Sequence, residues 1–221
     1  MKRKSFSLSK LHLGIMVILG WFALVAQFYI NALLKANPVP EMIIRYFTYF
    51  TILTNLIVAL SCTVLLFKPG SKWGIFFSQQ QSLAAITVYI VIVGLIYNTI
   101  LRFTWAPKGL QRVVDEILHS VIPILFLIYW LAFTPKNRLQ WKDIPAWLIF
   151  PFVYIVFVLL RGSASGFYPY PFIDRATLGL NKVFINAAGI TLVFIIMSLV
   201  CVFIGKLLTK NIERPIKSNH E

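Results

Sequence analysis

Six long apolar segments constrain this chain more than any other feature of its sequence. A helix needs about 20 mostly apolar residues to cross the hydrocarbon core of a bilayer, and 59% of the residues here are hydrophobic while 13% are charged. The pattern predicts an all-α, polytopic membrane protein with a bundle of six transmembrane helices in a single domain over residues 1–221. The expected helices cover about residues 11–34, 42–67, 83–103, 115–133, 144–160 and 183–208.

The fifth segment is the shortest and contains two prolines, Pro145 near its start and Pro151 inside it. Proline removes a helical hydrogen bond and kinks a helix, and neighbouring helices satisfy the freed carbonyls in a membrane. We therefore expect this span to be kinked or tilted.

The distribution of Lys and Arg predicts the orientation of the helices. With six spans, both tails and the second and fourth loops share one side, which holds 13 of the 21 basic residues. The positive-inside rule then places both termini in the cytoplasm of a multi-pass protein of the cell (plasma) membrane. The net charge of +14 is spread over loops and tails, with no soluble module that carries stacked aromatics. We therefore expect membrane lipids, including anionic headgroups, as partners and not nucleic acid.

The only cysteines, Cys62 and Cys201, fall in the inner halves of the second and sixth segments. No oxidising compartment reaches that depth, so we expect free thiols that pack as small apolar groups. The sequence has no Cys/His cluster with metal-ligand spacing and no phosphate-binding glycine loop, so we expect neither a metal nor a cofactor.

Strongly polar side chains are concentrated in the outer halves of the segments. Amide and ionisable groups in a membrane face the bundle interior or a water-filled cavity, because lipid gives them no partner. The inner halves carry mainly hydroxyls, which bond back to carbonyls of their own helix. We therefore expect a polar chamber that opens toward the outer leaflet. The outer polar residues are Gln27, Asn31, Thr48, Thr51, Asn55, Asn98, Arg102, His119 and Asn186.

Thr48 and His119 are the most reactive pair expected in this chamber. Thr48 and Asn55 are seven residues apart and share a helix face, and Asp115 and His119 are neighbours at a spacing of four. Pro123 has no N–H, so the carbonyl of His119 loses its helical partner and the backbone there is expected to be bent and hydrated. An intramembrane histidine is a functional candidate by default, whereas a threonine more often packs helices together.

The segment GSASGFYPYPFID connects the fifth and sixth helices. Its Tyr168 and Tyr170 alternate with prolines, which favour a stiff extended backbone, and tyrosines suit the bilayer interface. The segment is either an aromatic anchor or a lid over the chamber. In the second reading, Asp174 is a charge available to Arg102 or His119.

The order of the six helices, the Thr48–Asn55 stripe, the LHSVIP segment at His119 and the YPYPFID loop together resemble the androgen-induced membrane protein family. Eukaryotic members of that family are six-helix threonine hydrolases that cleave fatty acid esters of hydroxy fatty acids, with the threonine on the second helix and a histidine on the fourth. The resemblance implies catalytic roles for Thr48 and His119, with Thr51 as the alternative register, and an acyl ester as substrate.

A threonine and a histidine suffice for ester hydrolysis without a cofactor. A neutral imidazole accepts the threonine proton as the oxygen attacks the ester carbonyl, and then returns a proton to the leaving alcohol. Asp115 would orient the imidazole, and Asn55, Asn98 or Arg102 would donate to the oxyanion. Two other interpretations stay open: a small-solute transporter that uses the same chamber, and a non-enzymatic membrane protein. The sequence leaves the oligomeric state open.

Overall fold

The computed structural model describes residues 2–212, with the side chains of residues 8–210, and this part of the chain is helical without strands. The α-helices are α1 (Lys2–Leu34), α2 (Val39–Tyr46), α3 (Phe50–Phe67), α4 (Lys72–Ser78), α5 (Gln80–Ile96), α6 (Leu110–Glu116), α7 (Ile122–Phe133), α8 (Ile144–Ser165), α9 (Arg175–Leu178) and α10 (Leu180–Ile212). Two π-helical turns, η1 (Tyr97–Leu101) and η3 (Ile117–Val121), continue α5 and join α6 to α7. The 3₁₀ turns are η2 (Arg102–Thr104), η4 (Trp141–Asp143) and η5 (Pro171–Ile173).

Six helical segments of the described residues are long and apolar enough to cross a membrane. They follow the predicted segments in order, so the prediction of an all-α chain with six possible spans is confirmed. Their length and composition indicate a multi-pass membrane protein. The segments are Leu8–Leu34, Phe50–Phe67, Gln80–Thr104, Leu110–Phe133, Trp141–Ser165 and Leu180–Lys210.

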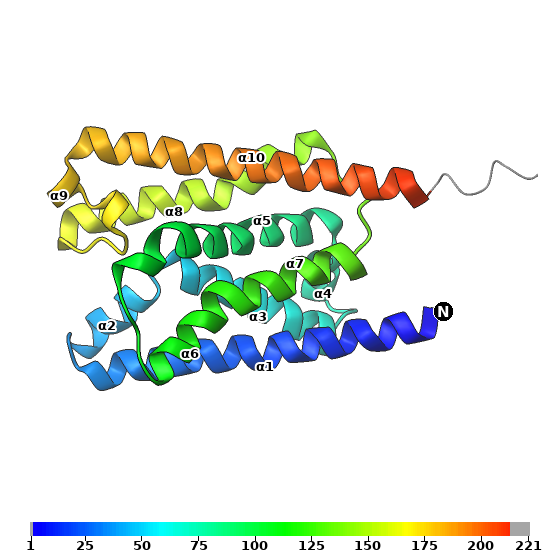
Figure 1. Ribbon diagram of the computed structural model, residues 1–221, viewed down its shortest axis with the longest axis horizontal. Coiled ribbons are helices and arrows are strands. Elements are labelled where there is room, and N and C mark those ends of the chain that lie inside the picture. The colour runs from blue at the N-terminus through cyan, green and yellow to red at the C-terminus, as the bar shows by residue number, and fades with distance from the viewer. Residues whose placement is uncertain (1, 213–221) are drawn as a thin grey trace, which may run out of the picture.

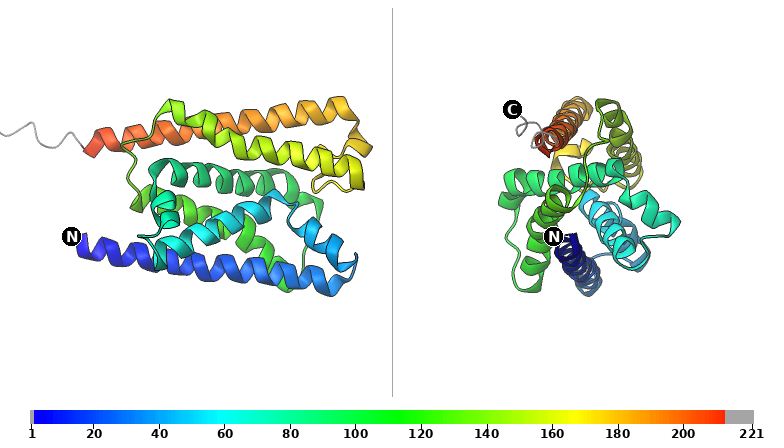
Figure 2. Two further views of the ribbon diagram at one scale, coloured as in Figure 1. Left: turned by 180° about the vertical axis from the view of Figure 1, so that it is seen from behind. Right: turned by 90° about the vertical axis from the view of Figure 1, so that its right-hand side faces the viewer.

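The helices form a bundle in which α1, α3, α5 and α7 pack together, while α8 and α10 pair on the far side of α5 (Figure 1). The end-on view in Figure 2 shows α8 and α10 at the periphery. The start of α1 and the end of α10 lie at the same end of the bundle (Figure 1). Large apolar side chains such as Phe126 and Trp130 fill the core. Cys62 and Cys201 are buried and free, as predicted.

The second predicted segment, residues 42–67, is not one continuous helix, because the chain leaves the helical conformation over residues 47–49. Tyr154 of α8 stabilises this break. Its hydroxyl accepts from the N–H of Phe50 at 3.2 Å and donates to the carbonyl of Thr48 at 2.9 Å. A tertiary contact thus satisfies backbone groups that a continuous helix would pair internally.

The fifth span stays helical on both sides of Pro151 and continues to Ser165, beyond the predicted end at residue 160. This extension contains Gly162, which packs against the Tyr168 ring so closely that a Cβ would overlap the ring. A glycine is therefore required there to seat the loop that follows α8.

Candidate functional site

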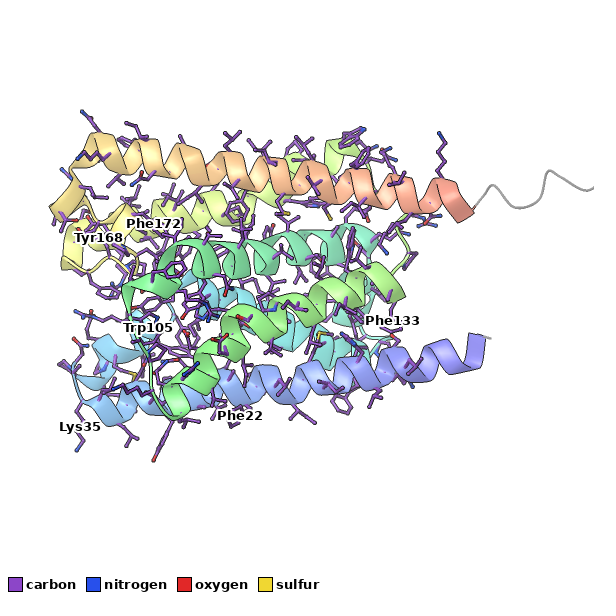
Figure 3. All side chains as sticks on the ribbon, in the orientation of Figure 1. Phe22, Lys35, Trp105, Phe133, Tyr168 and Phe172 are labelled. Carbon is purple, nitrogen blue, oxygen red and sulfur yellow. The ribbon has the colours of Figure 1, made fainter. Side chains whose placement is uncertain are left out.

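A polar chamber of about 390 Å³ lies between α1, α3, η1, η3 and the loop after α8. It is near the end of the bundle where Lys35, Trp105 and Tyr168 are found, opposite Phe133 and the start of α1 (Figure 3). This is the end that the charge pattern predicts to face outward. The lining residues discussed in the following paragraphs are Gln27, Asn31, Thr51, Tyr97, Trp105, Gln111, Asp115, His119 and Tyr170.

His119 is held in one position by two neighbours. Its Nδ1 lies 2.9 Å from the carbonyl oxygen of Asp115 and 3.1 Å from the Asp115 carboxylate. A carbonyl oxygen only accepts, so Nδ1 carries a hydrogen, and Nε2 is then the acceptor whenever the ring is neutral. The Tyr97 ring stacks on the imidazole with centroids 3.9 Å apart, and its hydroxyl donates to the buried Asp115 carboxylate. The contact between Asp115 and His119 was predicted from their spacing of four residues. The role of Tyr97 was not predicted, because a tyrosine within an apolar segment has no sequence feature that points to the histidine.

The predicted bend at His119 takes the form of the π-helical turn η3. A carbonyl accepts from the N–H five residues later in a π-helix and four residues later in an α-helix. Pro123 lies five residues after Leu118 and four after His119, and it has no N–H. Both carbonyls therefore need donors from other helices.

Two asparagines supply these donors. Asn55 Nδ2 donates to the Leu118 carbonyl at 3.2 Å, and Asn98 Nδ2 donates to the His119 carbonyl at 3.2 Å. Arg102 Nε donates to Asn98 Oδ1 at 2.9 Å and fixes that amide. We predicted Asn55, Asn98 and Arg102 as oxyanion donors, but their donor groups are engaged with protein atoms and none of the three lines the chamber. Their observed role is to stabilise the turn that carries His119.

The charges near the chamber also pair differently from the prediction. Arg102 forms a bidentate ion pair with Glu116, with both N–O distances 2.7 Å. Asp174 caps the N-terminus of α9, where its Oδ1 accepts from the N–H of Ala176 at 2.8 Å. The expected partnership of Asp174 with Arg102 or His119 is therefore not formed, because each charge has a nearer partner.

The structure separates the two candidate threonines. Thr48 is fully buried, and its hydroxyl donates at 2.7 Å to the backbone carbonyl four residues earlier. Thr48 does not line the chamber, whereas Thr51 does. The Thr51 Oγ1 lies 3.5 Å from the Tyr170 hydroxyl. Thr51 therefore shares the chamber with His119, because the break over residues 47–49 changes which side chains of the second span face inward.

The loop after α8 forms one wall of the chamber through Pro169, Tyr170 and Pro171. Asn186 Nδ2 ties it to α10 by donating to the Phe172 carbonyl at 2.8 Å. Burial raises the pKa of the Tyr170 phenol, so its hydroxyl stays protonated. Tyr170 thus lines the chamber, and the Tyr168 ring packs on Gly162 of α8.

Charged side chains fasten the same loop to α2 and α8. Glu41 accepts from Arg45 Nε at 2.7 Å and from Arg161 at 3.0 Å. The two guanidinium groups lie 4.4 and 5.3 Å from the ring centroid of Phe167. The hydrogen bond from Arg45 lowers the pKa of the Glu41 carboxyl below its ordinary value. We call these four residues the outer clasp.

A network of amides forms the opposite wall. Gln111 Nε2 donates to Gln27 Oε1 at 2.8 Å, and Gln27 Nε2 donates to Asn31 Oδ1 at 3.0 Å. Gln27 and Asn31 were predicted to face a chamber, but Gln111 was missed because it lies between the third and fourth predicted segments. The network offers polar contacts to a ligand without a charge.

The inner-half hydroxyls bond back to their own helices, as predicted. Ser61 donates to Val58, Thr87 to Leu83 and Ser198 to Phe194, at 2.9, 2.7 and 2.7 Å. Each of these hydroxyl hydrogens is therefore donated within its own helix.

A second cavity of about 360 Å³ adjoins the chamber between α5, α8 and α10. Most of its wall is aliphatic and aromatic. Thr51, Tyr97, Leu101 and Tyr170 line both spaces. The site thus has a polar part and an apolar part that meet at Thr51 and Tyr170.

No protein-family model matches the chain, and neither the curated proteins nor the solved structures include a match. The geometry of the site therefore carries the functional argument.

Proposed function

We propose that this chain is an integral membrane hydrolase that cleaves a fatty acyl ester, with Thr51 as nucleophile and His119 as general base. One observation carries the proposal. The Thr51 side chain and an imidazole held in the tautomer that leaves Nε2 as acceptor line one chamber, and this chamber adjoins an apolar cavity. The resemblance to a family of threonine hydrolases supports the same reaction class.

The proposed reaction has two halves. His119 Nε2 takes the Thr51 proton, directly or through one water, as Oγ1 attacks the ester carbonyl carbon. The tetrahedral intermediate then breaks its bond to the alcohol oxygen, which leaves with the proton from His119. Water then attacks the acyl-threonine carbonyl carbon with His119 again as base, the bond from this carbon to Oγ1 breaks, and Oγ1 takes the proton back from His119 as the fatty acid departs. Asp115 and Tyr97 keep the imidazole in place through both halves.

Tyr170 is the best-placed group to stabilise the oxyanion. Its oxygen accepts from the Thr51 N–H at 3.3 Å and lies 3.5 Å from Thr51 Oγ1, so the phenolic O–H is within reach of a ligand group bound next to Oγ1. A hydroxyl donor aimed at the developing negative charge stabilises the tetrahedral state more than the ground state.

The orientation in the membrane is part of the proposal. The basic asymmetry supports cytoplasmic termini in the cell membrane, which puts the chamber in the outer leaflet. A long-chain ester would then enter sideways from that leaflet.

The test is turnover of a long-chain acyl ester by purified protein in detergent. Thr51→Ala should abolish turnover, and His119→Ala should lower it by about 10²- to 10⁴-fold, the usual contribution of general-base catalysis. Thr48→Ala is the matched control and should retain turnover, because its hydroxyl is tied to a backbone carbonyl. Unchanged turnover in a folded Thr51→Ala variant would rule out the mechanism.

A further inference from the structure

We propose that the cavity between α5, α8 and α10 holds the hydrocarbon chain of a single-chain amphiphile whose polar end lies in the chamber. The inference deepens the proposed function and rests on it for the identity of the polar end, as an ester or the fatty acid released from it. Occupation of the cavity by the chain is a separate property that is measurable without turnover.

The lining of the cavity selects the apolar part of such a ligand. Its walls include Ile92 of α5, Ile149 and Phe152 of α8, and Ala187 and Phe194 of α10. Apolar cavities of this kind do not hold water well and bind hydrocarbons. These residues belong to segments apolar enough to span the membrane, so the medium around them is lipid chain and the natural occupant is hydrocarbon.

Polar groups occur mainly where the cavity meets the chamber. Thr51 and Tyr170 line both spaces, and their hydroxyl oxygens are 3.5 Å apart. A molecule that fills both spaces must therefore be apolar along one part and polar at the junction. A carboxylate or ester group on a long chain has this distribution.

The two spaces form one apolar part joined to one more polar part, with about 360 Å³ in the apolar cavity. A single-chain amphiphile, with one hydrocarbon chain and one polar end, has the same arrangement.

The cavity lies directly behind the two most exposed spans of the bundle, α8 and α10. In these spans 17% and 22% of the most apolar window is buried, compared with 56% in the span that contains α5. Both helices lie at the periphery of the bundle (Figure 2). On α10, Ala187 faces the cavity and the adjacent Ala188 is exposed.

The experiment uses palmitic acid that carries a photoreactive diazirine near its methyl end, with the full chain purified in detergent. After illumination, peptide mass spectrometry should find adducts on buried cavity residues such as Phe194. Ala187→Trp should remove most of these adducts, because the indole ring fills the space that the chain needs. Ile190→Phe, which also fills the cavity, should act in the same direction and guards against a folding defect in one variant.

Ala188→Trp is the matched control, because it adds the same ring to the exposed face of α10, and it should leave the yield unchanged. A phosphatidylcholine with the same photoreactive chain should label the buried Phe194 weakly. The proposal is overturned by equal labelling in the Ala187→Trp and Ala188→Trp variants, by adducts confined to exposed residues such as Leu192, or by equal labelling with the phospholipid.

The two proposals fail separately. Cavity labelling that persists in the absence of any ester turnover supports this inference and removes only the proposed hydrolysis. Ester turnover without cavity labelling removes this inference and leaves Thr51 and His119 as the proposed reactive pair.

Discussion

Asn98 should stabilise the protein specifically because Pro123 leaves the His119 carbonyl without a helical donor. Replacing Asn98 with leucine keeps a side chain of similar size but removes the donor to that carbonyl. It also removes the acceptor for Arg102 Nε. We therefore expect the π-helical turn that carries His119 to be destabilised.

The size of the effect follows from the contacts. An unpaired buried carbonyl costs about 1–3 kcal/mol in general, and side-chain hydrogen bonds measured between membrane helices average about 0.6 kcal/mol with a maximum near 1.7. We expect Asn98→Leu to lower the free energy of unfolding by about 1–2 kcal/mol. In a Pro123→Ala background, residue 123 has an N–H of its own, so the same substitution should cost about 1 kcal/mol less.

The assay is reversible unfolding in mixed micelles with increasing dodecyl sulfate, applied to the four proteins of a double-mutant cycle. Thr99→Val is a control, because Thr99 is an exposed neighbour of Asn98 on the turn η1. It should change the free energy of unfolding by less than about 0.5 kcal/mol. Strictly additive effects of Asn98→Leu and Pro123→Ala would refute the claim that the asparagine replaces the missing N–H.

Three further predictions concern the packing of Gly94, the outer clasp and the orientation in the membrane. Gly94→Ala should destabilise the protein by about 1–3 kcal/mol, because a Cβ there would lie 3.0 Å from Pro123 Cβ and 3.1 Å from the His119 carbonyl oxygen; Gly14→Ala, with open space around it, is the control in the same unfolding assay. The outer clasp should stabilise the fold above the ordinary glutamate pKa and lose this contribution as the pH falls through the lowered pKa of Glu41. Glu41→Gln should therefore reduce the acid sensitivity of thermal unfolding, and an unchanged pH profile would exclude the clasp as its source. A reporter fused to the C-terminus should lie in the cytoplasm, and a cysteine placed at Lys108 should react with an impermeant reagent from outside; the reverse pattern would exclude the proposed orientation.

Local sequence features predicted the elements of this fold well. Apolar run length identified all six possible spans, and the spacing of four placed Asp115 beside His119. Pro123 predicted a bend at the histidine, because the loss of an N–H is a property of the residue itself. The structure adds that the side-chain amides of Asn55 and Asn98 donate to the carbonyls at this bend.

Contacts between distant residues were not predictable in the same way. The break over residues 47–49 contains no glycine or proline, and the hydroxyl that stabilises it comes from Tyr154, more than 100 residues away. A continuous helix was therefore the natural expectation, and it placed Thr48 in the chamber. Asn55 also looked like a free donor, since the sequence does not reveal that its amide pairs with the Leu118 carbonyl.

The most direct test of the central claim is to locate the covalent intermediate. Purified protein should be treated with an activated palmitoyl ester, quenched in acid and analysed by peptide mass spectrometry. The proposed mechanism predicts one palmitoyl group on Thr51, which forms slowly in His119→Ala and is absent in Thr51→Ala. An adduct on Thr48, or no adduct on either threonine in folded protein that hydrolyses the ester, would contradict it.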